Sequence, residues 1–151
     1  MTDSTGDVEV LTFAELDPAT AYAVWRLRQR VFVVEQRAPY PDLDGRDLEP
    51  STRHLLVKEA GELVAYLRLL DDVAEARIGR VVVAPEARGR GYADELMRAA
   101  LLETGDRAVV LDAQTGLAGW YATFGFEVTG PEFDDDGVLH LPMRRERSTD
   151  R

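Results

Sequence analysis

Residues 76–105, ARIGRVVVAPEARGRGYADELMRAALLETG, run from an apolar strand through a glycine-containing turn into a helix. The consecutive valines at 81–83 are typical of a strand that is buried on both faces. In the segment 90–104 the apolar residues recur at helical spacing, and Gly105 can end the helix. The stretch therefore predicts a strand, a short turn and a helix N-terminus in succession. That order is found where α/β proteins bind phosphate groups.

The turn RGRGYA, residues 88–93, meets the physical requirements of an anion site. The first N–H groups of a helix have no internal acceptor, and the helix dipole adds partial positive charge there. Glycine allows the backbone to approach a ligand closely, and arginine can add charge-assisted hydrogen bonds. The turn lacks the lysine of a Walker loop, and Asp94 replaces the third glycine of a dinucleotide fingerprint. Taken alone, these residues equally fit a strand-to-helix turn with solvated arginines.

The rest of the chain alternates between strand and helix patterns. In the first predicted helix, Val24, Leu27, Val31 and Val34 form an apolar stripe. The whole order, β-α-loop-β-β-β-α-β-α-β-β, predicts an α/β fold with a mixed sheet flanked by helices. The further predicted elements are a strand at 8–14, a helix from Asp17 to residue 36, a loop at 37–51, two strands within 53–72, a strand at 107–114, a short helix at 116–124, and strands at 126–130 and 138–145.

Composition restricts the classes of function. The 151 residues fit one domain spanning 1–151, with polar and flexible ends expected at 1–7 and 146–151. A net charge of -10 disfavours nucleic acid and anionic membranes, and it favours a cationic or amine-bearing partner. The absence of cysteine excludes disulfides, thiolate zinc sites and a cysteine nucleophile. No apolar run approaches the ~18 residues of a membrane span, so we expect a soluble cytoplasmic protein.

The same turn resembles a family signature. Residues 88–93 match the [RQ]-x-x-G-x-[GA] pattern of the GNAT acyl-CoA N-acyltransferase superfamily, directly after the strand and at the start of the helix. The resemblance extends over nearly the whole chain and is to the ElaA branch, through LRQRVFVVEQ (27–36), RHLL (53–56), AQTGLAGWYATFGF (113–126) and DDDGVLHLPM (134–143). It implies a single GNAT domain with a mixed, splayed sheet of six to seven strands flanked by helices.

The resemblance also implies an activity and a cofactor. The chain would transfer an acetyl group from acetyl-CoA to a primary amine, by direct attack of the amine on the thioester, without a metal. Dimers are common in the superfamily that the chain resembles, so a homodimer is implied as well. The implied cofactor-binding residues are Val81, Val82 and Val83 along the pantetheine arm, then Arg88, Gly89, Arg90, Gly91, Tyr92 and Ala93 at the pyrophosphate, and Gln114 at the end of the next strand. Gln114 fits a helix-start residue equally well.

Three residues are candidates for catalysis. Tyr121 matches the tyrosine that protonates the departing thiolate in many GNAT enzymes, although its helical spacing also fits a core aromatic residue. Glu35 follows an apolar run, where partial burial would raise its pKa toward that of a base; a solvated carboxylate is the alternative. His140 matches the branch's terminal-strand DG-x-x-H pattern and ranks ahead of His54 as a site residue. Two histidines without metal-ligand spacing give no case for zinc.

Two acidic segments, 42–49 and 134–136, leave alternatives open. They can form an electronegative rim that attracts a cationic amine, or they can be solvated loop charges. The first lacks the register of a calcium loop. At the level of function, a non-catalytic acyl-CoA-binding module is the alternative to an acetyltransferase. A domain that binds ATP or a dinucleotide is a third hypothesis, which the absent motifs disfavour.

Overall fold

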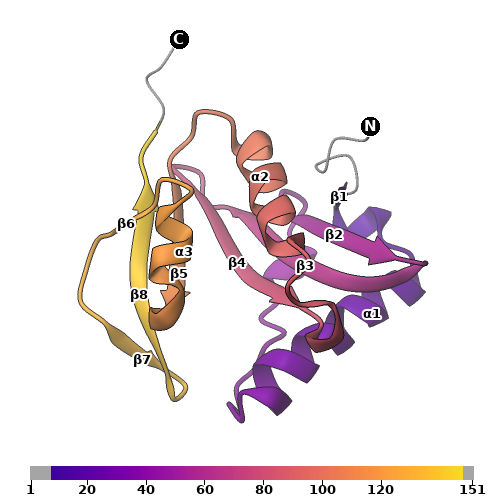
Figure 1. Ribbon diagram of the computed structural model, residues 1–151. Coiled ribbons are helices and arrows are strands. Elements are labelled where there is room, and N and C mark those ends of the chain that lie inside the picture. The colour runs from indigo at the N-terminus through magenta and orange to yellow at the C-terminus, as the bar shows by residue number, and fades with distance from the viewer. Residues whose placement is uncertain (1–7, 148–151) are drawn as a thin grey trace.

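The computed structural model describes residues 8–147, so most of the predicted flexible ends (1–7 and 146–151) lies outside it. Figure 1 shows a curved sheet with helices on its faces. The elements are β1 (Val8–Leu11), α1 (Pro18–Arg28), β2 (Arg53–Glu59), β3 (Glu62–Asp71), β4 (Ala76–Val83), α2 (Tyr92–Thr104), β5 (Val109–Gln114), α3 (Ala118–Ala122), β6 (Glu127–Val128), β7 (Phe133–Asp135) and β8 (Val138–Arg145).

Local sequence explains the first helix. Asp17 caps α1 by accepting a hydrogen bond of 2.7 Å from the Thr20 N–H, and Pro18 occupies the first turn. After Arg28 the chain continues as a π-helical segment, Gln29–Glu35. The wider turn changes which side chains face the core. Val24 and Val31 are buried as predicted, but Val34 is 64% exposed, so the predicted apolar stripe is wrong at its last position.

The strands form one mixed sheet in the order β1-β2-β3-β4-β5-β8-β6, with β7 paired to β8. Within it β4 and β5 are parallel and the other neighbours antiparallel. This confirms the predicted α/β class. The eight strands exceed the predicted six to seven because β7 forms in an acidic segment that had the composition of a loop.

Helices cover both faces of the sheet. Seven consecutive residues of β3, 64–70, are buried, which requires cover on both sides. The helices α1 and α2 both contact β3 and supply this cover from opposite faces (Figure 1). Within residues 8–147, every helix is too short or too polar to cross a bilayer.

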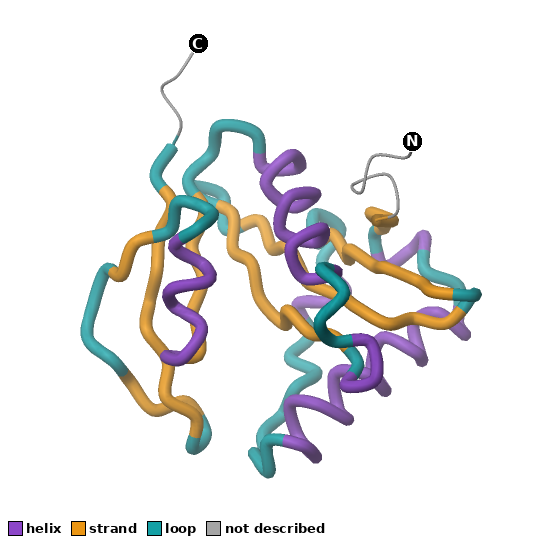
Figure 2. Tube along the Cα trace, in the orientation of Figure 1, coloured by secondary structure: helices purple, strands orange, loops and turns teal. Residues whose placement is uncertain are grey.

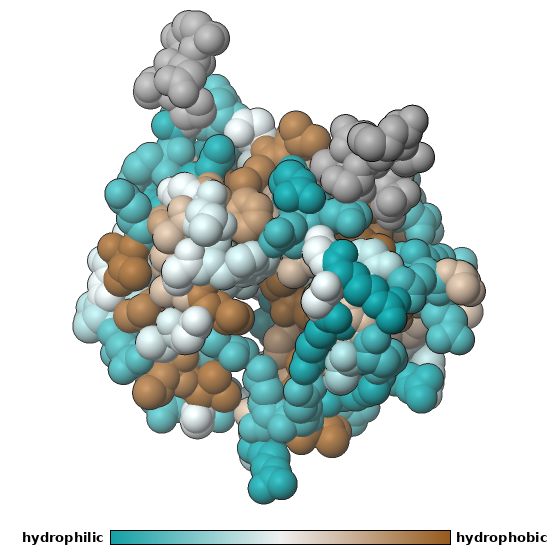
Figure 3. All heavy atoms as spheres, in the orientation of Figure 1, coloured by the Kyte–Doolittle hydropathy of each residue, from teal (hydrophilic) through white to brown (hydrophobic). Residues whose placement is uncertain are grey.

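The sheet opens between β4 and β5. These strands pair only at Ala76 with Val109 and at Arg77 with Val110, and their later residues diverge. The tube in Figure 2 shows the two strands separating, and Figure 3 shows a hollow at the same place with hydrophobic atoms in its depth. The predicted splay is thus present, and it positions the site described next.

Candidate active site

The diverging ends of β4 and β5 border a cavity of about 570 Å³, which we call the cofactor cavity. Its wall comes from the π-helical segment, β4, the glycine-containing turn, the start of α2, and α3. Eleven of the thirteen predicted site residues line it: Glu35, Val81, Val82, Val83, Arg88, Gly89, Gly91, Tyr92, Ala93, Gln114 and Tyr121. Arg90 and His140 do not.

The turn before α2 presents backbone donors. Gly89 and Gly91 both have φ of +82°, a conformation that suits glycine. Gly91 is the N-cap residue of α2, and no side chain caps the first N–H groups of this helix. In the part of the chain that the structure describes, the backbone N–H groups of residues 89–94 have no protein acceptor. Successive free N–H groups at a helix start form a concave anion site.

The two arginines of the turn already have carboxylate partners. Arg88 donates two hydrogen bonds of 2.9 Å to the two oxygens of Glu35, and its Nε donates to the Val83 carbonyl at 3.2 Å. Arg90 pairs with Glu59 at 2.6 Å, away from the cofactor cavity, and the Tyr92 hydroxyl donates to the same carboxylate. The backbone of the turn, rather than free arginine charge, is therefore the available anion-binding feature.

The environment of Glu35 differs from the prediction. Its side chain is 44% exposed, and the hydrogen bonds from Arg88 lower its pKa below the ordinary value. The expectation that burial raises this pKa is wrong, because a bidentate guanidinium stabilises the ionised carboxylate. Glu35 is a partner of Arg88 and lacks the environment of a base.

Tyr121 is buried, with 6% of its surface exposed, and burial raises its pKa to about 12. The ring contacts Trp120, with centroids 4.7 Å apart, and Phe126, at 6.3 Å. Among the described residues its hydroxyl has no hydrogen-bond partner. Tyr121 thus combines core packing with a protonated hydroxyl at a cavity wall.

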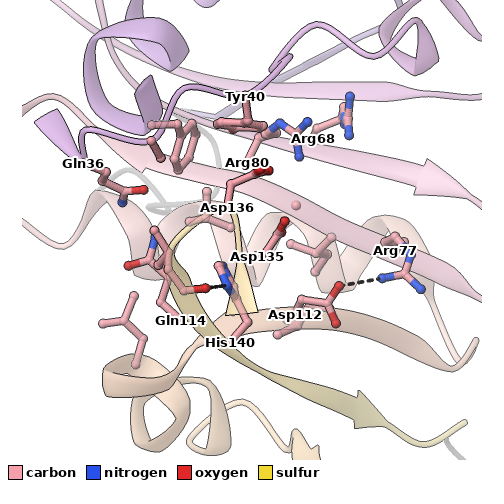
Figure 4. A pocket seen from close by; sticks show the side chains of 18 of the residues that line it. Gln36, Tyr40, Arg68, Arg77, Arg80, Asp112, Gln114, Asp135, Asp136 and His140 are labelled. Carbon is pink, nitrogen blue, oxygen red and sulfur yellow. Dashed lines mark hydrogen bonds and ion pairs between the residues drawn. The ribbon is translucent and has the colours of Figure 1, made fainter. Parts of the chain in front are cut away.

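A second, smaller cavity of about 190 Å³ adjoins the first, and we call it the acceptor cavity. Figure 4 shows Tyr40, Arg68 and Arg80 on one side of it, and Asp112, Gln114 and His140 on the other. The two cavities share the lining residues Phe32, Gln36, Val81, Gln114, Leu117 and Tyr121. Gln114 and Tyr121 therefore border both cavities.

The two histidines have different surroundings. His54 is buried, with its ring nitrogens 2.6 Å from the Tyr66 hydroxyl and 3.1 Å from the Asp47 carbonyl, and burial lowers its pKa. It is a structural residue. His140 lines the acceptor cavity, stacks on Phe133 and has Nδ1 2.9 Å from the Val138 carbonyl. Because a carbonyl only accepts, Nδ1 carries a proton in this arrangement, and in the neutral ring Nε2 is the nitrogen with the free lone pair.

The carboxylates of the first acidic segment are held in ion pairs with arginines, and two of them are buried. Asp42 and Asp47 are buried and pair with Arg28 at 2.9 and 2.7 Å, and Asp44 pairs with Arg68 at 2.8 Å. Asp42 and Asp47 are therefore not solvated loop charges, and three arginines distant in sequence neutralise the aspartates of this segment. Arg80 joins this cluster through Asp42.

The second acidic segment does reach the site. Asp135 and Asp136 line the acceptor cavity, where Figure 4 shows them between its two sides. Neither side chain has an ion-pair or hydrogen-bond partner among the described residues. In contrast, the arginines that line this cavity each have an aspartate partner. The unneutralised charge of the acceptor cavity is therefore negative.

Several lining residues were not predicted. Arg80, at φ +56° beside an irregularity in the β3–β4 pairing, and Tyr40, whose hydroxyl donates to Asp42 at 2.6 Å, belong to the acceptor cavity. Trp120 also lines the cofactor cavity, and its indole N–H donates to Asp94 at 2.8 Å. The Trp120–Asp94 contact joins residues far apart in the chain, so no local sequence signal marks it. Within residues 8–147 no group of histidine and acidic side chains is arranged to hold a metal ion.

Comparison with known proteins gives the family. Residues 18–147 match the acetyltransferase (GNAT) domain family. A UPF0039 protein of Mycobacterium tuberculosis is 46% identical over 136 residues, covering 87% of each chain. ElaA of Escherichia coli is 42% identical over 144 residues, covering 90% of this chain and 94% of its own.

Comparison with solved structures leads to the same family. The crystal structure of E. coli ElaA superposes with a TM-score of 0.84, at 39% identity over 92% of this chain and 98% of that one. An acyl-CoA N-acyltransferase from Pseudomonas aeruginosa gives a TM-score of 0.86, at 40% identity with the same coverage. The splayed sheet, the free N–H groups of the turn at residues 88–93 and these similarities lead to one conclusion: the chain belongs to the GNAT acetyltransferase family, in its ElaA-like branch, and has the fold of an acyl-CoA acyltransferase.

Proposed function

We propose that the chain is an acetyl-CoA-dependent N-acetyltransferase that acts on a primary amine. The observation that carries the proposal is the meeting of the two cavities at Gln114 and Tyr121. One cavity offers free backbone N–H groups to an anion, and the other offers unneutralised carboxylates to a cation. A phosphate-bearing acyl donor and an amine acceptor fit these opposite charges.

In this proposal the cofactor cavity holds coenzyme A. The N–H groups of residues 89–94 bind the pyrophosphate, and Tyr92 and Ala93 supply two of them from the first turn of α2. The pantetheine arm lies along Val81, Val82 and Val83, where β4 has separated from β5. Gln114 contributes from the opposite strand. Arg88 assists once it exchanges part of its contact with Glu35 for a phosphate oxygen, and Arg90 supports the turn from outside the cavity.

Transfer requires a neutral amine and a series of proton transfers. His140 Nε2 accepts a proton from the acceptor ammonium, since its other nitrogen donates to the Val138 carbonyl. The amine lone pair then attacks the thioester carbonyl, forming the C–N bond and a tetrahedral intermediate. Collapse breaks the C–S bond, Tyr121 donates its hydroxyl proton to the departing thiolate, and the excess proton on nitrogen passes to solvent. Tyrosinate recovers a proton from water, and the protonated His140 releases its proton to solvent.

Asp135 and Asp136 give the acceptor cavity its preference for a cation. A primary amine is protonated in water at neutral pH, so these carboxylates attract it in the form in which it arrives. His140 lies on the strand that follows these carboxylates. The β7–β8 hairpin thus provides both the carboxylates that attract the ammonium group and the imidazole that deprotonates it.

Release of CoA thiol tests the proposal. The chain is incubated with acetyl-CoA and a panel of primary amines, namely alkyl diamines, amino acid amides, aminoglycosides and short peptides with free N-termini. We expect amine-dependent thiol release, reduced at least about tenfold in His140→Gln. Tight acetyl-CoA binding without release from any amine would instead support a non-catalytic acyl-CoA-binding module. Thermal stabilisation by ATP but not by acetyl-CoA would contradict both functions.

A further inference from the structure

The splayed sheet leaves its two halves joined mainly at one end. The paired residues 76–77 of β4 and 109–110 of β5 lie there, and so do the contacts of Arg144 with Glu75 at 2.7 Å and of Arg77 with Asp112 at 3.6 Å. Beyond these residues the described part of the sheet provides no backbone pairing between the halves. The separation of the open ends, which border the cofactor cavity, must depend on side chains.

One hydrogen bond crosses the open end. Trp120 Nε1 on α3 donates to Asp94 Oδ1 on α2 at 2.8 Å, and both residues line the cofactor cavity. Asp94 is the third residue of α2, directly after the anion-binding turn. Trp120 precedes Tyr121 and contacts its ring edge to face, at a centroid distance of 4.7 Å. The bond therefore connects the turn that would hold the pyrophosphate with the residue that would protonate the thiolate.

The position of Asp94 is unfavourable for cofactor affinity alone. A carboxylate in the first helical turn interacts with the same N–H groups and dipole that a pyrophosphate requires. Its negative charge also repels a bound phosphate. The hydrogen bond that Asp94 accepts from Trp120 explains why a carboxylate stands at this position.

We propose that Asp94 and Trp120 are positioning residues, whose hydrogen bond sets the distance between the anion-binding turn and the Tyr121 hydroxyl. The inference rests on the proposed function, because it assigns these residues to thiolate protonation. A displacement of about 1 Å at a reacting group can lower a rate about 100-fold. Loss of the bond should thus affect the chemical step more than cofactor binding.

Four variants test this inference. Asp94→Ala removes the acceptor, Asp94→Asn keeps an oxygen acceptor but removes the charge, and Trp120→Phe keeps the ring but removes the donor. Trp25→Phe is the matched control, because Trp25 packs against His54 away from both cavities. We measure kcat and KM for acetyl-CoA with the panel amine that the unmodified chain acetylates fastest, and the Kd of coenzyme A by calorimetry.

We expect Asp94→Ala and Trp120→Phe to lower kcat about 10- to 100-fold, with KM and Kd changed less than about threefold. Asp94→Asn should keep kcat within about twofold and bind coenzyme A more tightly. The double variant Asp94→Ala/Trp120→Phe should lose no more than either single variant, because both remove the same bond. Trp25→Phe should retain kcat. Equal losses in Asp94→Asn and Asp94→Ala, or a lowered melting temperature without loss of kcat, would overturn the inference.

A second measurement does not depend on turnover. The chain has two tryptophans, so the indole N–H signals in an NMR spectrum are readily assigned with Trp25→Phe. Asp94→Ala should speed hydrogen exchange of the Trp120 indole and shift the Tyr121 ring signals, while Asp94→Asn should do neither. Unchanged Tyr121 signals in Asp94→Ala would overturn the positioning role. Absence of thiol release from every amine would overturn the proposed function separately.

Discussion

Glu35 and Arg88 are joined by two parallel hydrogen bonds of 2.9 Å, and both line the cofactor cavity. Glu35 ends the π-helical segment, whereas Arg88 begins the anion-binding turn. The pair fixes the turn to the first helical region. It also occupies a guanidinium that would otherwise be free to bind a phosphate oxygen.

Glu35→Gln should strengthen coenzyme A binding. Removing the carboxylate charge releases Arg88 toward the phosphates and raises the local positive potential. Because both side chains are nearly half exposed, we expect an effect of about threefold to fivefold in Kd, smaller at high salt. Glu86→Gln is the control, since it removes the same charge but releases Arg30, which does not line the cavity. Equal tightening in both variants would show a general charge effect, and an unchanged Kd in Glu35→Gln would contradict the release of Arg88.

Gly91→Val should weaken coenzyme A binding by at least about tenfold, because a side chain at φ +82° is strained and moves the N–H groups of the turn. Calorimetric titration with coenzyme A measures the change. Gly137→Val is the matched control: Gly137 has φ +89°, has open space where a side chain would extend, and lies in the β7–β8 turn away from the cofactor cavity. Both variants should lose similar thermal stability. A similar loss of affinity in both would remove support for the turn as the pyrophosphate site.

Tyr121→Phe should lower kcat about 100-fold while leaving the Kd of coenzyme A unchanged. The hydroxyl has no partner among the described residues, so its removal should lower the melting temperature only slightly. A clear loss of melting temperature with unchanged kcat would instead assign Tyr121 to packing alone.

The raised pKa of Tyr121 makes a further prediction for alkaline pH. Burial keeps the hydroxyl protonated up to a pKa of about 12, whereas an ordinary tyrosine, with a pKa of about 10, would lose half of its protons at about pH 10. As a proton donor, Tyr121 should therefore support an undiminished kcat between about pH 8 and 10. A decline of kcat centred near about pH 10 that is absent from Tyr121→Phe would contradict the shifted pKa.

Replacing Asp135 and Asp136 together by Asn should raise KM for a cationic amine about tenfold, because the acceptor cavity loses its unneutralised carboxylates. The effect should shrink as ionic strength rises. Glu103→Gln serves as a control for net charge, since Glu103 lies on the exposed side of α2. If KM for the amine is unchanged while thiol release persists, these carboxylates are solvated charges without a role in recognition.

Local patterns predicted much of this fold. The valines at 81–83 and the helical spacing from Ala93 to Leu101 placed β4 and α2 correctly. Burial of the valines on both faces was wrong, because only Val82 is buried and Val81 and Val83 are partly exposed beside the cofactor cavity. The segment of Phe133–Asp135 was missed as a strand, since three acidic or aromatic residues gain their pairing only from β8. The π-helical segment was also missed, and with it the exposure of Val34.

The candidate site was predictable where it depends on consecutive residues. The sequence of the turn alone was enough to predict that Gly89 and Gly91 belong to the site. The state of Glu35 was not predictable, because Arg88 is 53 residues away and the fold brings the two together. The same holds for Asp42 and Arg28, which the folded chain buries as a pair. Long-range charge pairing determines pKa values and free charge, and it leaves no periodic signal in a sequence.

The separation of β4 from β5 also affects self-association. Unpaired backbone at the outer edge of a sheet is a template on which another chain can add a strand and begin to aggregate. Here the unpaired part of β4 lies in the interior of the sheet, with β5 and α3 on the far side of the opening. A ligand in the cofactor cavity can reach that backbone, whereas a strand that adds at an outer edge of the sheet cannot pair with it. The fold thus keeps hydrogen-bonding groups free for a small partner while protecting them from amyloid-like growth.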